Sequence, residues 1–206
     1  MYNQLYKKLR KVFNLSEENY FTYLESLLRE EELTLHIKKA TQVIFDCISS
    51  KNSIWILGNG GSASTAEHFE TDLSFVRYDR KSLKINASAL TSNSALISAI
   101  SNDIGFDKVF SHQLQRKASI DDVCIVISAS GNSVNLINGV RVAKQMGLKS
   151  IGILGFDGGE LASQVDFSIV VKTEIGKYGP VEDAHLAICH AISRELLNRL
   201  NTLDVI

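Results

Sequence analysis

The sequence predicts an α/β fold in which a five-stranded parallel sheet carries helices on both faces. Short apolar runs alternate along the chain with longer segments of helical periodicity, as they do when crossover helices join parallel strands. Two of these runs end in turns rich in glycine and serine, where such sheets bind ligands. No shift in composition marks a boundary. We therefore expect one domain over residues 1–206, with a helical extension at 1–50 and the α/β core at 51–206.

The composition argues against several classes of partner. The 206 residues carry a formal net charge of −1, which favours neither nucleic acid nor a membrane surface, and no apolar run is long enough to cross a bilayer. The first residues are polar and basic and lack the apolar core of a signal peptide. Cys47, Cys124 and Cys189 lie far apart in apolar contexts, so we expect unpaired core thiols and a cytoplasmic protein.

Two helices are expected before the first strand. Ser16 followed by acidic residues is typical of a helix start, and apolar side chains then recur at helical spacing from Tyr20 to Leu28. A second apolar stripe runs from Leu33 to Ile48. Because no strand accompanies these helices, we expect them to pack on another subunit or on the outside of the core. The basic stretch at 1–13 is weakly amphipathic, and its state stays open.

The core elements follow in order from residue 53. Strands are expected at residues 53–57, 83–90, 123–127, 149–154 and 167–171, and helices from the turn at 58–62 to about residue 76 and at 92–100, 107–118, 134–146, 160–164 and 181–200. Loops are expected at 101–105 and at 172–180, which ends in the single proline, Pro180. The second strand is the more polar and suits an edge. A strand order of 2-1-3-4-5 would set the turns after the first and third strands side by side.

The turn at residues 128–133 (Ser-Ala-Ser-Gly-Asn-Ser) lies between an apolar strand and a helix. Free N–H groups and the helix dipole make such a helix start attractive to anions. Three hydroxyls and a glycine add to this, so we expect the turn, called the serine turn below, to bind phosphate. The alternative is that Ser130 or Asn132 merely caps the helix.

The turn at residues 58–62 (Gly-Asn-Gly-Gly-Ser), called the glycine turn below, is not a dinucleotide fingerprint. Ala63 stands where the third glycine belongs, no clear ribose-binding acid ends the second strand, and the lysine of a P-loop is missing. We therefore expect no nucleotide cofactor. The turn would let a small ligand approach the backbone, with Asn59 and Ser62 offering hydrogen bonds. The alternative is a tight turn that requires positive φ, which holds in part whatever the function.

The helix after the glycine turn carries His68 and, four residues later, Asp72, on one helical face. Its other acids, Glu67 and Glu70, are expected in solvent. The last helix carries Glu182, Asp183, His185 and His190, and one of the early acids is expected to complement the helix N-terminus. His190 has apolar neighbours, which by themselves favour a core histidine over a catalyst. His36 and His112 lack acidic or glycine-rich companions and are expected to be structural or surface residues.

Together these motifs resemble those of the sugar isomerase (SIS) domain family, and their order and spacing are similar to those of bacterial phosphoheptose isomerases. They are Gly-Asn-Gly-Gly-Ser-Ala from residue 58, His68 with its acid, Ser-Asn-Asp at 101–103, the serine turn and the late His190, within about residues 15–200. The resemblance implies a flavodoxin-like three-layer sandwich. It also implies a homotetramer, with N-terminal helices in its interfaces and active sites nearby.

The resemblance further implies roles for single residues. It assigns a sugar phosphate to Asn59, Gly60, Ser62, Asn102, Asp103, Ser128, Ser130, Ser133 and Glu182, with the phosphate at the three serines of the serine turn. The catalytic pair of the family matches Asp72 and His190. Some members hold zinc, and the matching ligands here are His68, Asp72, Glu182 and His190, with one Zn²⁺ per subunit.

Three positions depart from the family pattern. Asp72 replaces a glutamate and is one methylene shorter, Glu182 replaces a glutamine and adds a negative charge, and Ala129 replaces a threonine. The implied reaction interconverts sedoheptulose 7-phosphate and D-glycero-D-manno-heptose 7-phosphate through an enediol, for heptose in lipopolysaccharide and other surface polysaccharides. The departures motivate an alternative, a SIS protein that binds a phosphosugar or the replication initiator protein without catalysis. Cleavage of a sugar ether is a third, weaker possibility.

Overall fold

The computed structural model describes residues 17–75 and 84–203, so the stretch at 1–13 and the expected cap Ser16 lie outside the described residues. Five parallel strands form one sheet: β1 (Ser53–Gly58), β2 (Asn86–Ala89), β3 (Val123–Ser128), β4 (Lys149–Phe156) and β5 (Phe167–Lys172). Their order is β2-β1-β3-β4-β5, as predicted, with β2 at an edge. The fold class is therefore confirmed.

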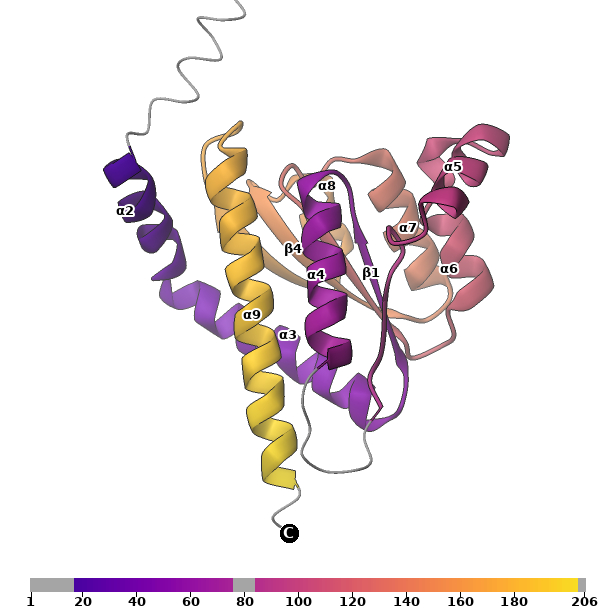
Figure 1. Cartoon of the computed structure of the whole chain (residues 1–206), viewed down its shortest axis with the longest axis horizontal. Helices are drawn as coiled ribbons and strands as arrows, with labels where there is room; N and C mark the ends of the chain where they lie inside the picture. The colour runs from indigo at the N-terminus through magenta and orange to yellow at the C-terminus, as the bar shows by residue number, and fades with distance from the viewer. Residues whose placement is uncertain (1–16, 76–83, 204–206) are drawn as a thin grey trace, which may run out of the picture.

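Helices cover both faces of this sheet (Figure 1). Their bounds are α2 (Glu17–Leu28), α3 (Glu31–Ser49), α4 (Gly61–Phe75), α5 (Ser94–Asp103), the 3₁₀ turn η1 (Phe106–Lys108), α6 (Ser111–Lys117), α7 (Val134–Gln145), α8 (Gly159–Gln164) and α9 (Tyr178–Leu203). Figure 1 shows α4 and α9 side by side in front of the strands. Within the described residues, no helix is long and apolar enough to cross a membrane.

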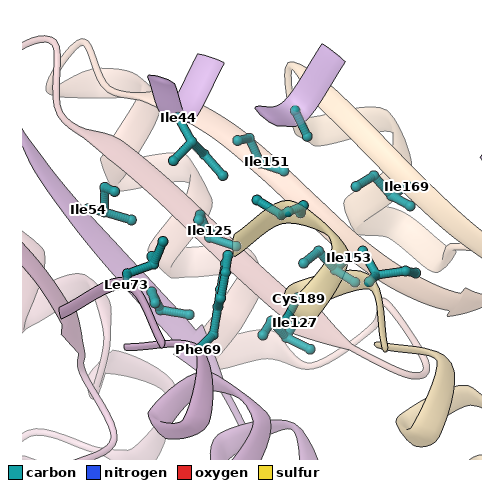
Figure 2. Close-up of a cluster of buried hydrophobic side chains, with 14 of the residues drawn as sticks. Ile44, Ile54, Phe69, Leu73, Ile125, Ile127, Ile151, Ile153, Ile169 and Cys189 are labelled. Atoms are coloured by element: carbon teal, nitrogen blue, oxygen red, sulfur yellow. The ribbon is translucent and has the colours of Figure 1, made fainter. Parts of the chain in front are cut away.

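Alternate strand residues supply the two cores. Ile54 and Ile56 point to one face of the sheet, whereas Trp55 and Leu57 point to the other, as the two-residue period of a strand requires. On the first face the core contains Ile44 of α3, Phe69 and Leu73 of α4, Cys189 of α9 and the strand residues Ile125, Ile127, Ile151, Ile153 and Ile169 (Figure 2). The second core lies beneath α5 to α8. The helix α3 thus packs on the α/β unit of its own chain and supplies part of the first core instead of lying outside it, whereas packing on another subunit stays a prediction.

Several element boundaries differ from the predictions. The side chain of Asn93 accepts a hydrogen bond from the N–H of Leu96, so α5 begins at Ser94 and continues through residues 101–103, which were expected in a loop. It ends before Gly105, whose φ of +130° only glycine adopts readily. The helix expected at 107–118 is divided into η1 and α6. Among its described residues, the strand expected at 83–90 pairs with β1 over Asn86–Ala89, and the N–H of Leu90 donates one further hydrogen bond to the carbonyl of Ile56.

The last helix begins earlier than predicted. It starts at Tyr178, so Pro180 lies in its first turn instead of ending the preceding loop. The first four N–H groups of a helix have no intrahelical acceptor, and a proline there therefore loses no hydrogen bond. The consequence is that Glu182 and Asp183 lie in the second turn of α9.

Candidate active site

The glycine turn and the serine turn lie side by side at the carboxyl edge of the sheet. They follow β1 and β3, which are neighbouring strands. The amide of Asn59 in the glycine turn and the amide of Asn135, just after the serine turn, exchange two hydrogen bonds of 2.8 and 3.0 Å. These bonds confirm the adjacency that the predicted strand order implies.

The three hydroxyls of the serine turn differ in their hydrogen-bond partners. The Oγ of buried Ser128 accepts a hydrogen bond from the N–H of Gly131 at 3.0 Å, and the Oγ of Ser130 accepts one from the N–H of Asn132 at 3.3 Å. Ser133 is the N-cap residue of α7, but its side chain makes no capping hydrogen bond. The alternative in which Ser130 or Asn132 caps α7 is therefore wrong. The hydroxyl of Ser133 and the free N–H groups of α7 can bind an anion.

The serine turn is braced from the β4 side by α8. The Oδ1 of Asn132 accepts a hydrogen bond from the N–H of Glu160 at 2.9 Å, and the carbonyl of Gly131 accepts one from the N–H of Leu161 at 3.0 Å. Gly131 has a φ of +65°, and a Cβ atom there would lie 1.9 Å from the carbonyl oxygen of Gly158. The close contact of two backbones therefore requires a glycine at residue 131.

His68, Asp72 and His190 form a compact cluster on the adjacent helices α4 and α9. The Nε2 atoms of the two imidazoles lie 2.9 Å apart, which is a hydrogen bond when one ring donates and the other accepts. The carboxylate oxygens of Asp72 lie 3.6 Å from the Nε2 of His68 and 3.7 Å from that of His190. The side chain of His190 is 52% exposed, so the interpretation of His190 as a core histidine is wrong.

The donor atoms of this cluster fit a divalent metal ion. All three lie within 4.8 Å of one another. Ligands at about 2.1 Å from a tetrahedral zinc ion are about 3.4 Å apart, and the separations of 2.9, 3.6 and 3.7 Å lie around that value. Three protein ligands with an open fourth position are typical of catalytic zinc sites rather than structural ones.

Glu182 is not a member of this cluster. Its carboxylate lies against Gly61, where a Cβ atom would come within 2.6 Å of Oε1. Gly61 is separated from His68 by about 10 Å of helix axis. The next acid, Asp183, accepts a hydrogen bond from the hydroxyl of Tyr20. Because α9 begins at Tyr178, the expectation that one of these two acids serves the helix N-terminus is wrong.

The other predicted ligand-binding residues are distributed around the two turns. Ser62 is buried in the first turn of α4, and Gly60 has a φ of +55° with open space where a side chain would be. The glycine turn thus needs positive φ, as the alternative interpretation states. Asn102 and Asp103 end α5, and their side chains bond to each other at 2.8 Å. In the described part of the chain, no side-chain hydrogen bond joins them to either turn.

Sequence reasoning overlooked two polar residues near the site. Asn135 is buried on α7. Its position directly before the apolar Leu136 and Ile137 could have indicated that this polar side chain is buried. Glu70 was expected in solvent, but its Oε2 accepts hydrogen bonds from the N–H of Ala89 at 2.9 Å and the hydroxyl of Ser92 at 3.0 Å. It therefore fixes the end of β2, an interaction that no local pattern indicates.

Burial changes the ionisation of several groups in the interior of the protein. His185 on α9 is 0% exposed and neither ring nitrogen has a hydrogen-bond partner. Burial lowers the pKa of His185 to about 4, because the charged ring would have neither water nor a hydrogen-bond partner there. Burial also raises the pKa of the Cys47 and Cys124 thiols to about 12. All three cysteines are buried and unpaired, which confirms their prediction as core residues.

A family model described as the SIS domain matches residues 19–155 of the chain. The chain belongs to the SIS domain family. This SIS chain is 36% identical to the phosphoheptose isomerase of Aliarcobacter butzleri over 165 residues, which are 80% of this chain and 86% of that relative. It is 38% identical to the probable phosphoheptose isomerase of Thermoplasma acidophilum over 175 residues, covering 82% and 93% of the two chains.

Solved structures agree with this assignment. The phosphoheptose isomerase of Neisseria gonorrhoeae superimposes with a TM-score of 0.74 at 27% identity, covering 94% of this SIS chain and 97% of that protein. A phosphoheptose isomerase from Francisella tularensis has the same TM-score at 22% identity and shows the shared fold. The resemblance inferred from the motifs is thus confirmed for the family and for the fold.

Proposed function

We propose that this SIS protein is an aldose–ketose isomerase that acts on a sugar phosphate. The observation that carries the proposal is the cluster of His68, Asp72 and His190, which brings a carboxylate and two imidazoles within 4.8 Å of one another. Isomerisation needs such a set, because a proton leaves one carbon while another reaches the carbonyl oxygen. The similarity to proteins named phosphoheptose isomerase supports the same class of reaction.

The proposed chemistry assigns one role to each group. The serine turn binds the phosphate, with the hydroxyls of Ser130 and Ser133 and the N-terminus of α7 facing the anion. The carboxylate of Asp72 removes the proton from C1 of the ketose, and the C–H electron pair forms the double bond of the enediol. The carbonyl oxygen takes a proton from His190, which His68 can replenish across 2.9 Å. Return of the first proton to C2, with loss of the O1–H proton to His190, then gives the aldose and restores the protonated imidazole.

A metal ion is the finer part of the proposal. In a zinc-bound form, His68, Asp72 and His190 would hold one Zn²⁺ through these same atoms, and the metal would polarise the carbonyl oxygen of the substrate in place of the proton from His190. Glu182, whose carboxylate lies against Gly61, is proposed as a residue that contacts the sugar. Asn59, Gly60, Ser62, Asn102 and Asp103 are proposed to line the same sugar site.

We further propose that the substrate is sedoheptulose 7-phosphate and the product D-glycero-D-manno-heptose 7-phosphate, which supplies heptose for lipopolysaccharide and other surface polysaccharides. The names of the relatives support this choice. The site fits a phosphorylated polyol, because hydroxyls, amides and a carboxylate surround the two turns. Three unpaired buried thiols suit the reducing cytoplasm, where we place the reaction.

The deciding experiment follows the conversion by NMR. Purified protein is incubated with sedoheptulose 7-phosphate, with and without added zinc, and the aldose is detected by its anomeric signals. We expect turnover in the wild type, loss of turnover in His190→Ala, and unchanged turnover in His112→Ala, a control histidine on α6. Tight binding of the sugar phosphate without any turnover, with or without zinc, would instead support a non-catalytic SIS protein.

The proposed assembly is a homotetramer. Phe21 on α2 is 70% exposed and Leu35 on α3 is 52% exposed, and Leu28 lies between them in sequence with 36% exposed. In a single chain these apolar side chains would be exposed to water. Contact between copies of the chain would bury them. Sedimentation at micromolar concentration should give a mass of four chains, and a monomer would contradict the assembly.

A further inference from the structure

The amide of Asn135 has no freedom to rotate. It is 3% exposed, and its Oδ1 accepts two hydrogen bonds, from the N–H of Leu136 at 2.9 Å and from the Nδ2 of Asn59 at 2.8 Å. A backbone N–H can only donate, so the oxygen of Asn135 must face it. The Nδ2 of Asn135 therefore points to the Oδ1 of Asn59, at 3.0 Å.

The orientation of Asn135 in turn fixes that of Asn59. Reversing the Asn59 amide would set oxygen against oxygen and nitrogen against nitrogen, with loss of both hydrogen bonds. In the observed orientation, the Oδ1 and one N–H of the Asn59 side chain are hydrogen-bonded to Asn135. The second N–H of the amide is not used in this pair. Asn59 is only half-buried, so this N–H can reach a ligand at the glycine turn.

We infer that Asn135 is a positioning residue that makes Asn59 a hydrogen-bond donor toward the sugar of the bound sugar phosphate. This inference rests on the proposed function for the identity of the ligand. Asn135, a buried residue of α7, thereby determines which groups of the sugar Asn59 can bind. These are hydroxyl or carbonyl oxygens that accept a hydrogen bond. Asn135 also couples the two turns, since the amide pair joins the glycine turn after β1 to the helix that follows the serine turn.

The chain offers a matched control on the same helix. Asn138 lies three residues after Asn135, is half-buried, and donates one hydrogen bond through its Nδ2 to the carbonyl of Asp107 at 2.9 Å. Asn135→Leu and Asn138→Leu therefore make the same chemical change on α7. Only the first removes the partner of Asn59. Leucine adds no charge that would disturb an anion at the serine turn.

The experiment compares two ligands by calorimetry. With Asn135→Leu, the dissociation constant for sedoheptulose 7-phosphate should rise about fivefold to tenfold, the effect of one hydrogen bond, while that for inorganic phosphate should change less than about twofold. Asn138→Leu should change neither constant. In an Asn59→Ala background, Asn135→Leu should have no further effect on the sugar phosphate. Equal losses for both ligands, or additive losses in the double variant, would overturn the inference and leave Asn135 a purely structural residue.

A measurement on the unmodified protein is independent of the variants' folding and of the reaction. In ¹⁵N-labelled protein, one side-chain amide proton of Asn59 should exchange with solvent at least about tenfold more slowly than those of exposed Asn198, because it is bonded to Asn135. Exchange at the same rate would overturn the inference even if the protein isomerises sugar phosphates. Slow exchange in a protein that does not bind sedoheptulose 7-phosphate would support the fixed amide and reject the proposed substrate.

Discussion

The hydroxyl of Tyr20 donates a hydrogen bond of 2.5 Å to the carboxylate of Asp183 and so ties α2 to α9 beside the glycine turn. Burial and the adjacent Asp183 raise the pKa of Tyr20 well above its ordinary value, which keeps the hydroxyl protonated as a donor. The phenol also covers Gly179, where a Cβ atom would lie 3.2 Å from the hydroxyl oxygen. The N-terminal helix thus supports the start of the helix that carries His190.

Tyr20→Phe should lower the free energy of unfolding by about 1 kcal/mol, because it removes a charge-assisted hydrogen bond from a partly exposed site. Urea melts measure the change. Tyr23→Phe, on the same helix, is the control and should have little effect, since the described residues provide no hydrogen-bond partner for its hydroxyl. Equal losses in both variants would show that the Tyr20–Asp183 bond contributes nothing of its own.

Gly131→Ala should be strongly destabilising, because a Cβ atom would lie 1.9 Å from the carbonyl oxygen of Gly158 in a backbone of φ +65°. Gly176→Ala is the control: its φ is also positive, at +96°, but nothing lies within 4 Å of the added atom. The control should cost about 1 kcal/mol from backbone strain alone. Thermal melts should separate the two clearly, and equal costs would mean that the contact between the serine turn and α8 is loose.

His185 should make the protein less stable in mild acid. Burial lowers its pKa to about 4 in the folded state, whereas the unfolded chain binds the proton near pH 6.5. Between these values the unfolded state holds more protons, so stability falls as the pH is lowered from about 6.5 to about 4 and then levels off, by up to about 3 kcal/mol. Urea melts at several pH values across this range should show that the free energy of unfolding depends less on pH in His185→Leu than in the wild type. His112→Gln should leave this pH dependence unchanged. An unchanged pH dependence in the first variant would contradict the assignment.

Asp72→Glu should raise turnover, because the longer side chain gives the carboxylate the reach of the glutamate that the family resemblance implies at this position. A base misplaced by about an ångström can cost on the order of a hundredfold in rate. Asp72→Asn should remove turnover and weaken zinc binding, because the substitution removes the carboxylate, one of the three donor groups. Glu67→Gln, one residue before His68 and exposed, is the control for the loss of a carboxylate on α4. Lower turnover in Asp72→Glu would show that the pocket has adapted to aspartate.

The sequence was sufficient for the strands because their signal is local: apolar runs such as residues 123–127 indicate buried strands, and turn residues mark where each strand stops. Strand order is not local, and the order 2-1-3-4-5 that brings the two turns together matched the flavodoxin-like fold implied by the family resemblance. The four-residue spacing of His68 and Asp72 correctly placed both on one face of α4.

What escaped prediction depends on contacts between distant segments. His190 has apolar sequence neighbours, yet it faces outward to His68 of another helix, and only the packing of α9 on α4 decides this. The pairing of Asn135 with Asn59 and that of Tyr20 with Asp183 join residues far apart in sequence. Helix ends were similarly misplaced, since Asn93 and Pro180 serve helix starts that propensity alone does not locate.

The amide pair of Asn59 and Asn135 has a consequence for folding. Its two members are 76 residues apart in sequence, so the ligand site forms only after β1 and β3 have paired. A ligand that bridges the two turns then binds the native state alone and raises its stability in proportion to the logarithm of the ligand concentration. Such a ligand should slow unfolding more than it speeds refolding, and it would protect the first half of the chain against proteolysis as much as the second.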